Sequence, residues 1–305
     1  MRGDEWLAEQ FEANRAHLKA VAYRMLGSGC EADDAVQECW LRVSRADTSV
    51  VENLEGWLTS VVARICLNIL RSRKSRCEES LAEGGEHPNL PDPRRSDPQN
   101  EAMLAESVGV ALLVVLERLT PAERVAFVLH DVFGSTFDEI APIVRRSPEA
   151  ARQLASRARR RVRGKDAAKD TNFSGQLRTV AAFLSALRAG DLEGLLAVLD
   201  PEVVRRADPA ALPSGAAGEL HGAAAVAREA MAYAHAAGLA QPALVDESVG
   251  FVVAPRGQLR IAVRCVVKEG RIAGMNVIAD PGRLPRLKIA VPAECRQVTE
   301  ARGTR

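Results

Sequence analysis

The sequence predicts a multidomain protein in which two all-α modules precede one α+β module. Three observations support this fold class. Residues 5–76 follow a helical period almost throughout, residues 119–163 divide into three short capped helices, and residues 259–267 alternate apolar and polar side chains as a strand does. The 305 residues, 47% of them hydrophobic, are enough to bury the cores of two or three domains.

The first module, residues 1–76, is expected to be a helical bundle with a break at Gly27-Ser28-Gly29. One helix, DDAVQECWLRV, begins near Asp33 and combines an acidic face with an apolar stripe. A later helix runs from Gly56 to Arg76. Its predicted core stripe comprises Leu58, Val61, Val62, Ile65 and Ile69.

The same helix has a second, polar face. Arg64, Asn68 and Arg71 follow one another at i, i+4 and i+7, so they are placed to meet a nucleic acid side by side. The alternative is that this face is simply solvated. Trp57, the aromatic residue near this face, is expected to belong to the core.

A linker is expected at 77–105, because the stretch from Cys77 to Gln99 is rich in Pro, Gly and charge and poor in large apolar residues. The second module, 106–165, follows it. Its helix starts are marked by Thr120 with Glu123 and by Thr136 with Glu139, both at capping-box spacing. The whole unit resembles a helix-turn-helix.

Further signals place the turn and the last helix of this module. Gly134 permits a turn between the first two helices, and Ser147 is a suitable N-cap before Pro148. The last helix is expected to pack through one face and to expose the opposite one. The packing face comprises Ala151, Leu154, Ala155, Ala158 and Val162.

The basic charge of the chain is concentrated in this last helix. From Arg145 to Lys165 there are nine basic residues and one acidic residue, a local charge of +8 in a chain whose net charge is +1. This density suits the neutralisation of phosphates, so we expect the helix to contact DNA. A solvated basic helix is the alternative.

The third module is expected at 174–285, after a short linker at 166–174, with a tail at 286–305. A helix carrying Val180, Phe183, Leu184 and Leu187 turns at Gly190-Asp191 into a second helix that ends near Asp200-Pro201, and another helix covers 222–237. Strands are expected at Val249–Val253, around Leu259–Val267 and at Ile272–Ile278. Together they predict an α+β fold with a concave interior.

The composition predicts a cytoplasmic protein. No stretch approaches the roughly 18 apolar residues that span a bilayer, and the N-terminus is unlike a secretory signal, so we expect no membrane partner. The six cysteines have no CxxC pair and no metal-like spacing with histidines. We therefore expect free thiols, several of them in the core, and neither zinc, another cofactor nor disulfides.

DDAVQECW, GWLTSVVARICLNILRSRKSR, a linker and LTPAERVAFVLHDVFGSTFDEIAPIVRRSPEAARQLASRARRRV occur in an order that resembles an extracytoplasmic-function sigma factor. The resemblance covers residues 5–165 and implies sigma region 2 followed by region 4. It implies a transcription initiation factor, not an enzyme, whose partners are core RNA polymerase and promoter DNA. The DDAVQECW helix would bind the polymerase, the helix ending at Arg76 would read the minus-ten element, and helix 148–163 would read the minus-35 element.

On this basis three sets of site residues are expected. The minus-35 set comprises Arg145, Arg146, Ser147, Arg152, Gln153, Ser156, Arg157 and Arg160. The minus-ten set comprises Arg64, Asn68, Arg71, Arg73, Lys74 and Arg76. The polymerase set comprises Asp33, Asp34, Gln37, Glu38 and Trp40.

The third module resembles the SnoaL-like extension of one subgroup of these sigma factors, with Asn89–Pro93, Asp208–Gly215 and Asp280–Leu284 at the positions of the subgroup's motifs. We expect it to regulate activity in cis. The alternatives are that it binds a small ligand of unknown identity or is an active SnoaL-like enzyme. Asp208 and His221 are the catalytic candidates, but neither has a partner in sequence that would tune its pKa, so no catalytic residue is assigned. A stand-alone DNA-binding repressor would not need the DDAVQECW and GWL segments.

Overall fold

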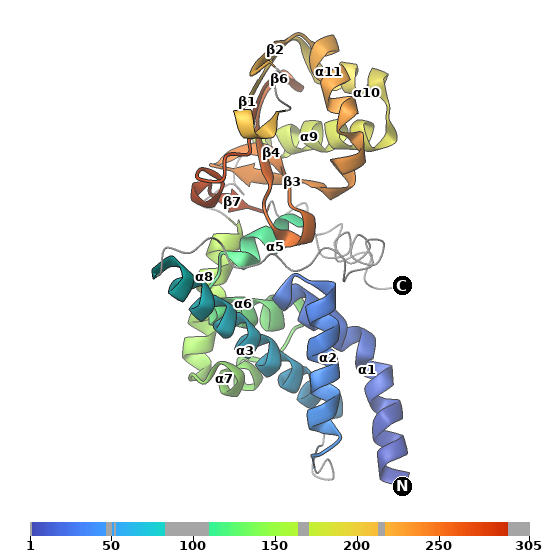
Figure 1. The fold of residues 1–305 in the computed structure, drawn as a ribbon, viewed down its shortest axis with the longest axis vertical. Helices are drawn as coiled ribbons and strands as arrows, with labels where there is room; N and C mark the ends of the chain where they lie inside the picture. Colours follow the sequence, from blue (N-terminus) through green and yellow to red (C-terminus); the bar gives the residue numbers. More distant parts are fainter. Residues whose placement is uncertain are drawn as a thin grey trace. The chain divides into compact units, whose positions relative to one another are not determined.

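A computed structural model describes residues 2–46, 51, 53–82, 110–163, 171–212 and 217–291. The chain forms two compact units. Unit 1 comprises Met1–Leu104 and Leu116–Arg159, and unit 2 comprises Ala105–Val115 and Arg160–Arg305. Unit 1 is helical and unit 2 contains a sheet, which confirms the predicted fold class of helical modules followed by an α+β domain (Figure 1).

Unit 1 begins with three long helices, α1 (Arg2–Leu26), α2 (Gly29–Val43) and α3 (Leu54–Ala82). The expected break between the first two is confirmed. Gly27 has φ of 76°, and the Ser28 side chain caps α2 by accepting a hydrogen bond from the Glu31 N–H. Helix α3 continues to Ala82, into the segment for which a linker was expected, and residues 83–109 lie outside the described part.

Helix α3 is buried on more than the one predicted stripe. Leu58, Val62 and Ile65 are buried as expected, whereas Val61 and Ile69 are half-buried. Further buried side chains extend around the helix, because α3 contacts α1 and α2 and also two helices of the second module. These additional buried residues are Thr59, Ala63, Cys66, Leu67 and Leu70.

The second module contains α6 (Pro121–Phe127), a π-helical turn (Val128–Val132), α7 (Phe137–Val144) and α8 (Pro148–Arg163). Both predicted capping boxes are present. The Thr120 and Thr136 side chains accept from the N–H of Glu123 and Glu139, and each glutamate accepts from the backbone N–H of its threonine. Gly134, with φ of 72°, forms the expected turn before α7.

The two helical modules pack together within unit 1, where α3 contacts α6 and α7. Phe133, just after the π-helical turn, receives the edge of the His17 ring at 5.2 Å and the Arg24 guanidinium at 5.1 Å. Arg124 of α6 is 3% exposed, and among the described residues none accepts from its Nε or Nη2 atom. Burial lowers the pKa of Arg124 to about 10, so it is still charged at neutral pH.

Unit 2 includes Ala105–Val115, so it contains most of helix α5 (Val110–Glu117). Its other long helices are α9 (Thr171–Ala189), α10 (Leu192–Val198) and α11 (Ala223–Ala232). Helix α9 begins within the expected second linker, while residues 164–170 lie outside the described part. The turn at Gly190-Asp191 is confirmed, because Gly190 has φ of 69° and Asp191 caps α10.

The sheet of unit 2 has seven strands in the order β2-β1-β6-β5-β4-β3-β7. Strands β1 and β6 are parallel, and the other neighbours are antiparallel. The strands have the following bounds: β1 Leu199–Ala207, β2 Glu219–His221, β3 Ala240–Val245, β4 Ser248–Val253, β5 Ile261–Lys268, β6 Arg271–Ile278 and β7 Ile289–Ala290.

The three predicted strands correspond to β4, β5 and β6, but the other four were missed. The second helix ends at Val198, and Asp200-Pro201 belongs to strand β1, which corrects the expected helix end. The helix expected at 222–237 ends at Ala232 and is followed by a 3₁₀ segment, Ala234–Leu239. β1 and β3 each contain a proline, which weakens a strand pattern in sequence, and β2 and β7 are very short.

The core of unit 2 lies between the sheet and helices α9 to α11, which lie on one side of it (Figure 1). The predicted apolar stripe of α9 is confirmed, because Val180, Phe183, Leu184 and Leu187 are all buried. Phe183 stacks on Phe251 of β4 with ring centroids 6.1 Å apart.

Three cysteines occupy core positions, as expected. Cys39, Cys66 and Cys265 are buried free thiols, and burial raises the pKa of each to about 12, which makes them poor nucleophiles. Within the described ranges, no helix is both long enough and apolar enough to cross a membrane.

We expect Arg124→Met to stabilise unit 1. The substitution replaces a guanidinium whose Nε and Nη2 have no hydrogen-bond partner among the described residues by a shorter, uncharged side chain. Desolvation raises the pKa of the neighbouring Glu117 to about 6, so at pH 5 this carboxyl is protonated and needs no cation, and we expect a gain of about 1–3 kcal/mol at that pH. Thermal unfolding of the full chain measures the change. The control is Arg71→Met on the exposed surface of α3, which should stay within about 0.5 kcal/mol of the parent. Destabilisation by Arg124→Met would show that the guanidinium stabilises the packing of α6 against α3.

Candidate nucleic-acid and polymerase interfaces

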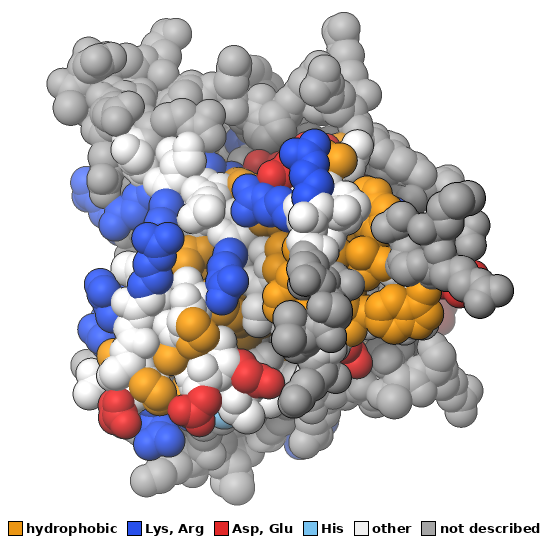
Figure 2. All heavy atoms as spheres, turned by 90° about the horizontal axis from the view of Figure 1, so that it is seen from below, with side chains coloured by type: hydrophobic (Ala, Val, Ile, Leu, Met, Phe, Trp, Pro, Cys, Tyr) orange, Lys and Arg blue, Asp and Glu red, His pale blue; other side chains and the backbone are white. Residues whose placement is uncertain are grey.

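Helix α8 buries a narrow face of small residues and exposes a polar one. Ala151, Ala155, Ala158 and Val162 are buried, as the helical period predicts, while Leu154 is half-buried. The exposed side carries the arginines. On the face drawn in Figure 2, most of the Lys and Arg side chains lie on the left side of the view.

Every residue predicted for the minus-35 set is exposed. The set lies on α8 and the turn before it, and its members are Arg145, Arg146, Ser147, Arg152, Gln153, Ser156, Arg157 and Arg160. Two contacts fix α8 against the rest of the module. Arg152 lies over the Phe137 ring at 5.3 Å, and Arg159 Nε donates to Asp131 Oδ1 at 2.6 Å, which raises the pKa of Arg159.

The turn between α7 and α8 has an unusual backbone. Arg145 ends α7 in the left-handed conformation, with φ of 59°, a region that favours glycine. Ser147 Oγ then accepts from the Ala150 N–H at 3.2 Å and caps α8. Hydrogen bonds from its own backbone N–H and from Ser147 hold the pKa of Glu149 below its ordinary value. The start of α8 is therefore well determined.

The predicted minus-ten residues divide into two groups. Arg64, Asn68, Arg71 and Lys74 are exposed on α3, as expected for a surface that contacts nucleic acid. Arg73 is half-buried instead: it forms an ion pair with Glu31 and donates to the Leu26 carbonyl at 3.1 Å, which ties α3 to the other two long helices. Arg76 lies within α3, but its side chain is outside the described part. Trp57 is half-buried.

The predicted polymerase set forms one face of α2. Asp33, Asp34 and Gln37 are exposed, whereas Glu38 and Trp40 are half-buried. Trp40 rests against Phe11 of α1 with ring centroids 5.1 Å apart. Two carboxylates of the set have intramolecular partners, since Asp33 pairs with Lys19 at 2.8 Å and Glu38 with Arg42 at 2.8 Å. Asp34 and Gln37 therefore offer the more accessible polar groups.

Comparisons with known proteins agree with this arrangement. Residues 10–76 match the Sigma-70 region 2 family and residues 109–162 match the Sigma-70 region 4 family. The chain is 41% identical over 204 residues to the ECF RNA polymerase sigma factor SigJ of Mycobacterium tuberculosis, an alignment that covers 65% of this chain and 64% of SigJ. It is 37% identical over 198 residues to the probable ECF RNA polymerase sigma factor SigI of the same species, covering 65% of this chain and 68% of SigI. The chain belongs to the ECF RNA polymerase sigma factors.

A solved structure is also similar to this sigma factor. The crystal structure of the extracytoplasmic function sigma factor SigJ from Mycobacterium tuberculosis is 31% identical and covers 91% of this chain and 98% of that chain, with a TM-score of 0.43. The α+β domain of unit 2 is consistent with the SnoaL-like extension expected from the sequence. In contrast, the SigJ sequence alignment spans just under two thirds of that relative.

The two residues weighed as catalytic candidates in this sigma factor have structural environments. Asp208 accepts from the backbone N–H groups of Ala279 and Asp280 and forms an ion pair with Arg283. His221 is exposed beside Glu219, with Nε2 3.0 Å from Oε1. Neither side chain lines the cavity in the unit 2 core. Asp208 instead holds the segment after β6 against the end of β1.

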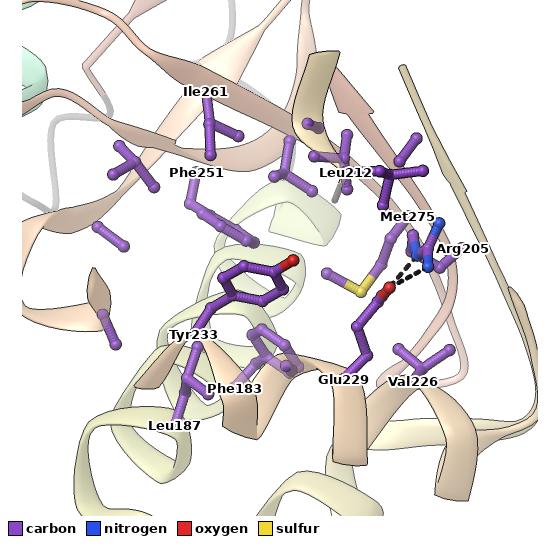
Figure 3. A pocket seen from close by; sticks show the side chains of 18 residues that line it. Phe183, Leu187, Arg205, Leu212, Val226, Glu229, Tyr233, Phe251, Ile261 and Met275 are labelled. Carbon is purple, nitrogen blue, oxygen red and sulfur yellow. Dashed lines mark hydrogen bonds and ion pairs between the residues drawn. The ribbon is translucent and has the colours of Figure 1, made fainter. Parts of the chain in front are cut away.

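Sequence reasoning missed the polar group that does line this cavity. Arg205 of β1 is 3% exposed and pairs with Glu229 of α11, in a surface otherwise dominated by apolar side chains (Figure 3). A period-two reading of β1 would have placed Arg205 on the same face as Val203, which is buried. That signal was missed because a helix was expected to end near Asp200-Pro201 and no strand was predicted after it.

Proposed function

We propose that this sigma factor binds core RNA polymerase in the cytoplasm and directs it to promoters by reading minus-35 and minus-ten elements. The observation that carries the proposal is helix α8. It has a fixed, capped start, a buried alanine face and an exposed row of Arg, Gln and Ser side chains, the residue types that hydrogen-bond base edges and phosphates in the major groove. The test is run-off transcription with purified core polymerase on promoters selected from a random library.

In the minus-35 proposal, two kinds of contact are combined. Arg152, Gln153, Ser156 and Arg157 lie in the first ten residues of α8, the part that enters the groove in helix-turn-helix proteins, so they are assigned to base edges. Arg145 and Arg146 lie in the preceding turn, and their charges suit adjacent phosphates. The complete proposed set remains the eight exposed residues described above.

The minus-ten proposal rests on the exposed polar face of α3. Arg64, Asn68 and Arg71 lie along one exposed side of α3, so a single strand can approach them without disturbing the core. Lys74 extends the positive charge. Arg73 remains in the proposed set as a residue that must exchange its present partners before it contacts DNA. Arg76 remains in the set on sequence grounds.

The polymerase-docking proposal assigns Asp33, Asp34, Gln37, Glu38 and Trp40 to the contact with the core enzyme. An acidic, exposed helix face suits a basic partner surface. The Trp40 ring packs against the Phe11 ring, so its position on α2 is fixed before the partner binds. Asp33 and Glu38 already form ion pairs within the chain, with Lys19 and Arg42, and these pairs restrict how their side chains point. Asp34 and Gln37 are then the strongest candidates for direct contact.

We further propose that the C-terminal domain regulates the sigma modules in cis. The region 4 match begins at residue 109, yet Ala105–Val115 belong to the same compact unit as the extension. Within unit 2, the Ala111 N–H donates to Gln241 Oε1 of β3 at 3.2 Å, and the Val291 N–H donates to the Val162 carbonyl at 2.9 Å. These two bonds, one to the start of α5 and one to the end of α8, support a regulatory contact between the extension and region 4. Tethering keeps such weak contacts occupied.

Substitution of Arg152 and Arg157 by Ala should weaken promoter binding. Each arginine that reads a base edge contributes about 1–3 kcal/mol, so holoenzyme affinity for selected promoters should fall by roughly tenfold or more per residue. Competition binding at fixed salt measures this. Arg178→Ala, on the exposed surface of α9, is the matched control. Wild-type affinity of the double variant would refute the minus-35 assignment.

The charge reversals Asp34→Arg and Glu38→Arg together should abolish copurification with core polymerase, because they place two cations on a face assigned to a basic partner. Circular dichroism should show unchanged helical content. The control is Glu193→Arg on the exposed surface of unit 2. If the double variant copurifies as well as the parent chain, α2 is not the docking face.

Truncation after Lys165 should change run-off transcription several-fold and lengthen the distance between labels at positions 45 and 130. A milder variant, Gln241→Ala, removes one hydrogen-bond acceptor and should shift transcription in the same direction by a smaller factor. Gln258→Ala, elsewhere in unit 2, is the control. Regulation in cis would be excluded by equal transcript yields and equal label distances for the full and truncated chains.

A further inference from the structure

The core of unit 2 contains a cavity between the concave face of the sheet and helices α9 and α11. Its volume is ≈ 150 Å³. Phe183, Phe251, Ile261 and Met275 contribute apolar walls from four different elements (Figure 3). An engineered protein cavity of about this size, lined by Leu, Ile and Phe, binds benzene. The cavity therefore has room for one six-membered ring.

Polar groups enter this apolar space at one place. Arg205 Nε donates to Glu229 Oε2 at 2.7 Å, and Nη2 donates to Oε1. Arg205 Nη1 donates to the carbonyls of Ala217 and Gly218 at 3.1 and 3.2 Å. The guanidinium is thus bonded to a carboxylate and to two backbone carbonyls. The Glu229 and Tyr233 side chains both line the cavity, and in Figure 3 the Met275 sulfur lies between the carboxylate and the Tyr233 hydroxyl group.

The ion pair is poorly explained by stability alone. Arg205 is buried and the Glu229 side chain is 26% exposed. Desolvation of the buried guanidinium costs free energy that the attraction between the two charges barely recovers, so an apolar pair of equal volume is commonly as stable or more stable. The pair also lies where the other inward-facing residues of β1, such as Val203, are apolar. Two opposite charges leave the cavity wall neutral, which disfavours a charged occupant.

We propose that this cavity binds an uncharged, ring-sized apolar molecule that carries one hydroxyl group. The carboxylate of Glu229 has lone pairs beyond the two that accept from Arg205, so it can accept a hydrogen bond from the ligand's hydroxyl. The Tyr233 hydroxyl can donate to the same ligand oxygen. Phe183, Phe251 and Met275 enclose the ring.

This inference goes beyond the proposed function, because it concerns a binding site whose test requires no transcription. The probes are 4-methylphenol, toluene, which lacks the hydroxyl, and 4-methylbenzoate, which is charged. The full chain is labelled with ¹³C at its methionine methyl groups, and NMR follows two of them. Met275 lines the cavity, whereas Met25 is buried in unit 1 and reports non-specific effects.

The expected result is a saturable shift of the Met275 methyl signal with 4-methylphenol and no shift of Met25. Toluene should bind about tenfold more weakly, since it leaves the Glu229 hydrogen bond unmade, and 4-methylbenzoate should not bind. The proposal is overturned if 4-methylphenol causes no saturable shift at its solubility limit, if toluene binds equally well, or if 4-methylbenzoate binds more tightly than either.

Amino-acid substitutions distinguish the contribution of the apolar cavity to binding from that of its polar groups. Arg205→Met with Glu229→Leu keeps the volume and removes both charges, so this double variant should bind 4-methylphenol and toluene equally. Ala230→Leu fills the cavity from α11 and should abolish binding of both, while Ala224→Leu, exposed on the same helix, should change nothing. Tyr233→Phe gives a second measure that does not disturb the ion pair and should weaken 4-methylphenol alone. A preference for 4-methylphenol that survives both polar variants would overturn the assignment of its hydroxyl contact.

Discussion

The burial of helix α3 on several sides constrains the rest of unit 1. Helices α1 and α2 pack against it, and so do α6 and α7 of the second module. Arg64, Asn68 and Arg71 are exposed along one stripe of α3, and Ser72, Lys74 and Ser75 widen the exposed surface farther along the helix. The core therefore determines which side chains can contact a nucleic acid, and an apolar residue elsewhere on α3 cannot be changed without affecting two modules at once. On α3, the residues proposed to contact DNA and the residues that pack in the core occupy different faces of the same stretch of helix.

The sequence predicted the helical modules well because their boundaries depend on local chemistry. Thr120 with Glu123 and Thr136 with Glu139 form their capping boxes within four residues, and glycine supplies the turn at Gly134. The buried and exposed faces of α8 followed from its period alone. In contrast, the contacts of α3 with α6 and α7 depend on residues far apart in sequence, so the extra buried side of α3 was not foreseen.

The α+β domain was predicted less completely from the sequence than the helical modules were. Strands β4, β5 and β6 were predictable because they alternate and are bounded by turns. Strand β1 was missed, because Asp200-Pro201 at its start was interpreted as the end of a helix and no element was predicted for the residues that follow. The error hid Arg205, the one charged residue of β1 that is buried. Its pairing with Glu229 joins a strand to a helix 24 residues later and has no local signal. Polar groups inside a core are found from tertiary structure, not from periodicity.

The left-handed backbone of Arg145 affects how mutations at this position change the stability of the protein. A non-glycine residue in that region costs about 1–2 kcal/mol, so glycine or asparagine at 145 would make the turn between α7 and α8 more stable. The same change would remove a cation beside the start of the DNA-reading helix. Selection of random variants for heat resistance alone would therefore favour loss of this arginine, whereas selection for transcription would retain it. If Arg145 contacts DNA as proposed, folding and promoter recognition have opposite requirements at this one side chain.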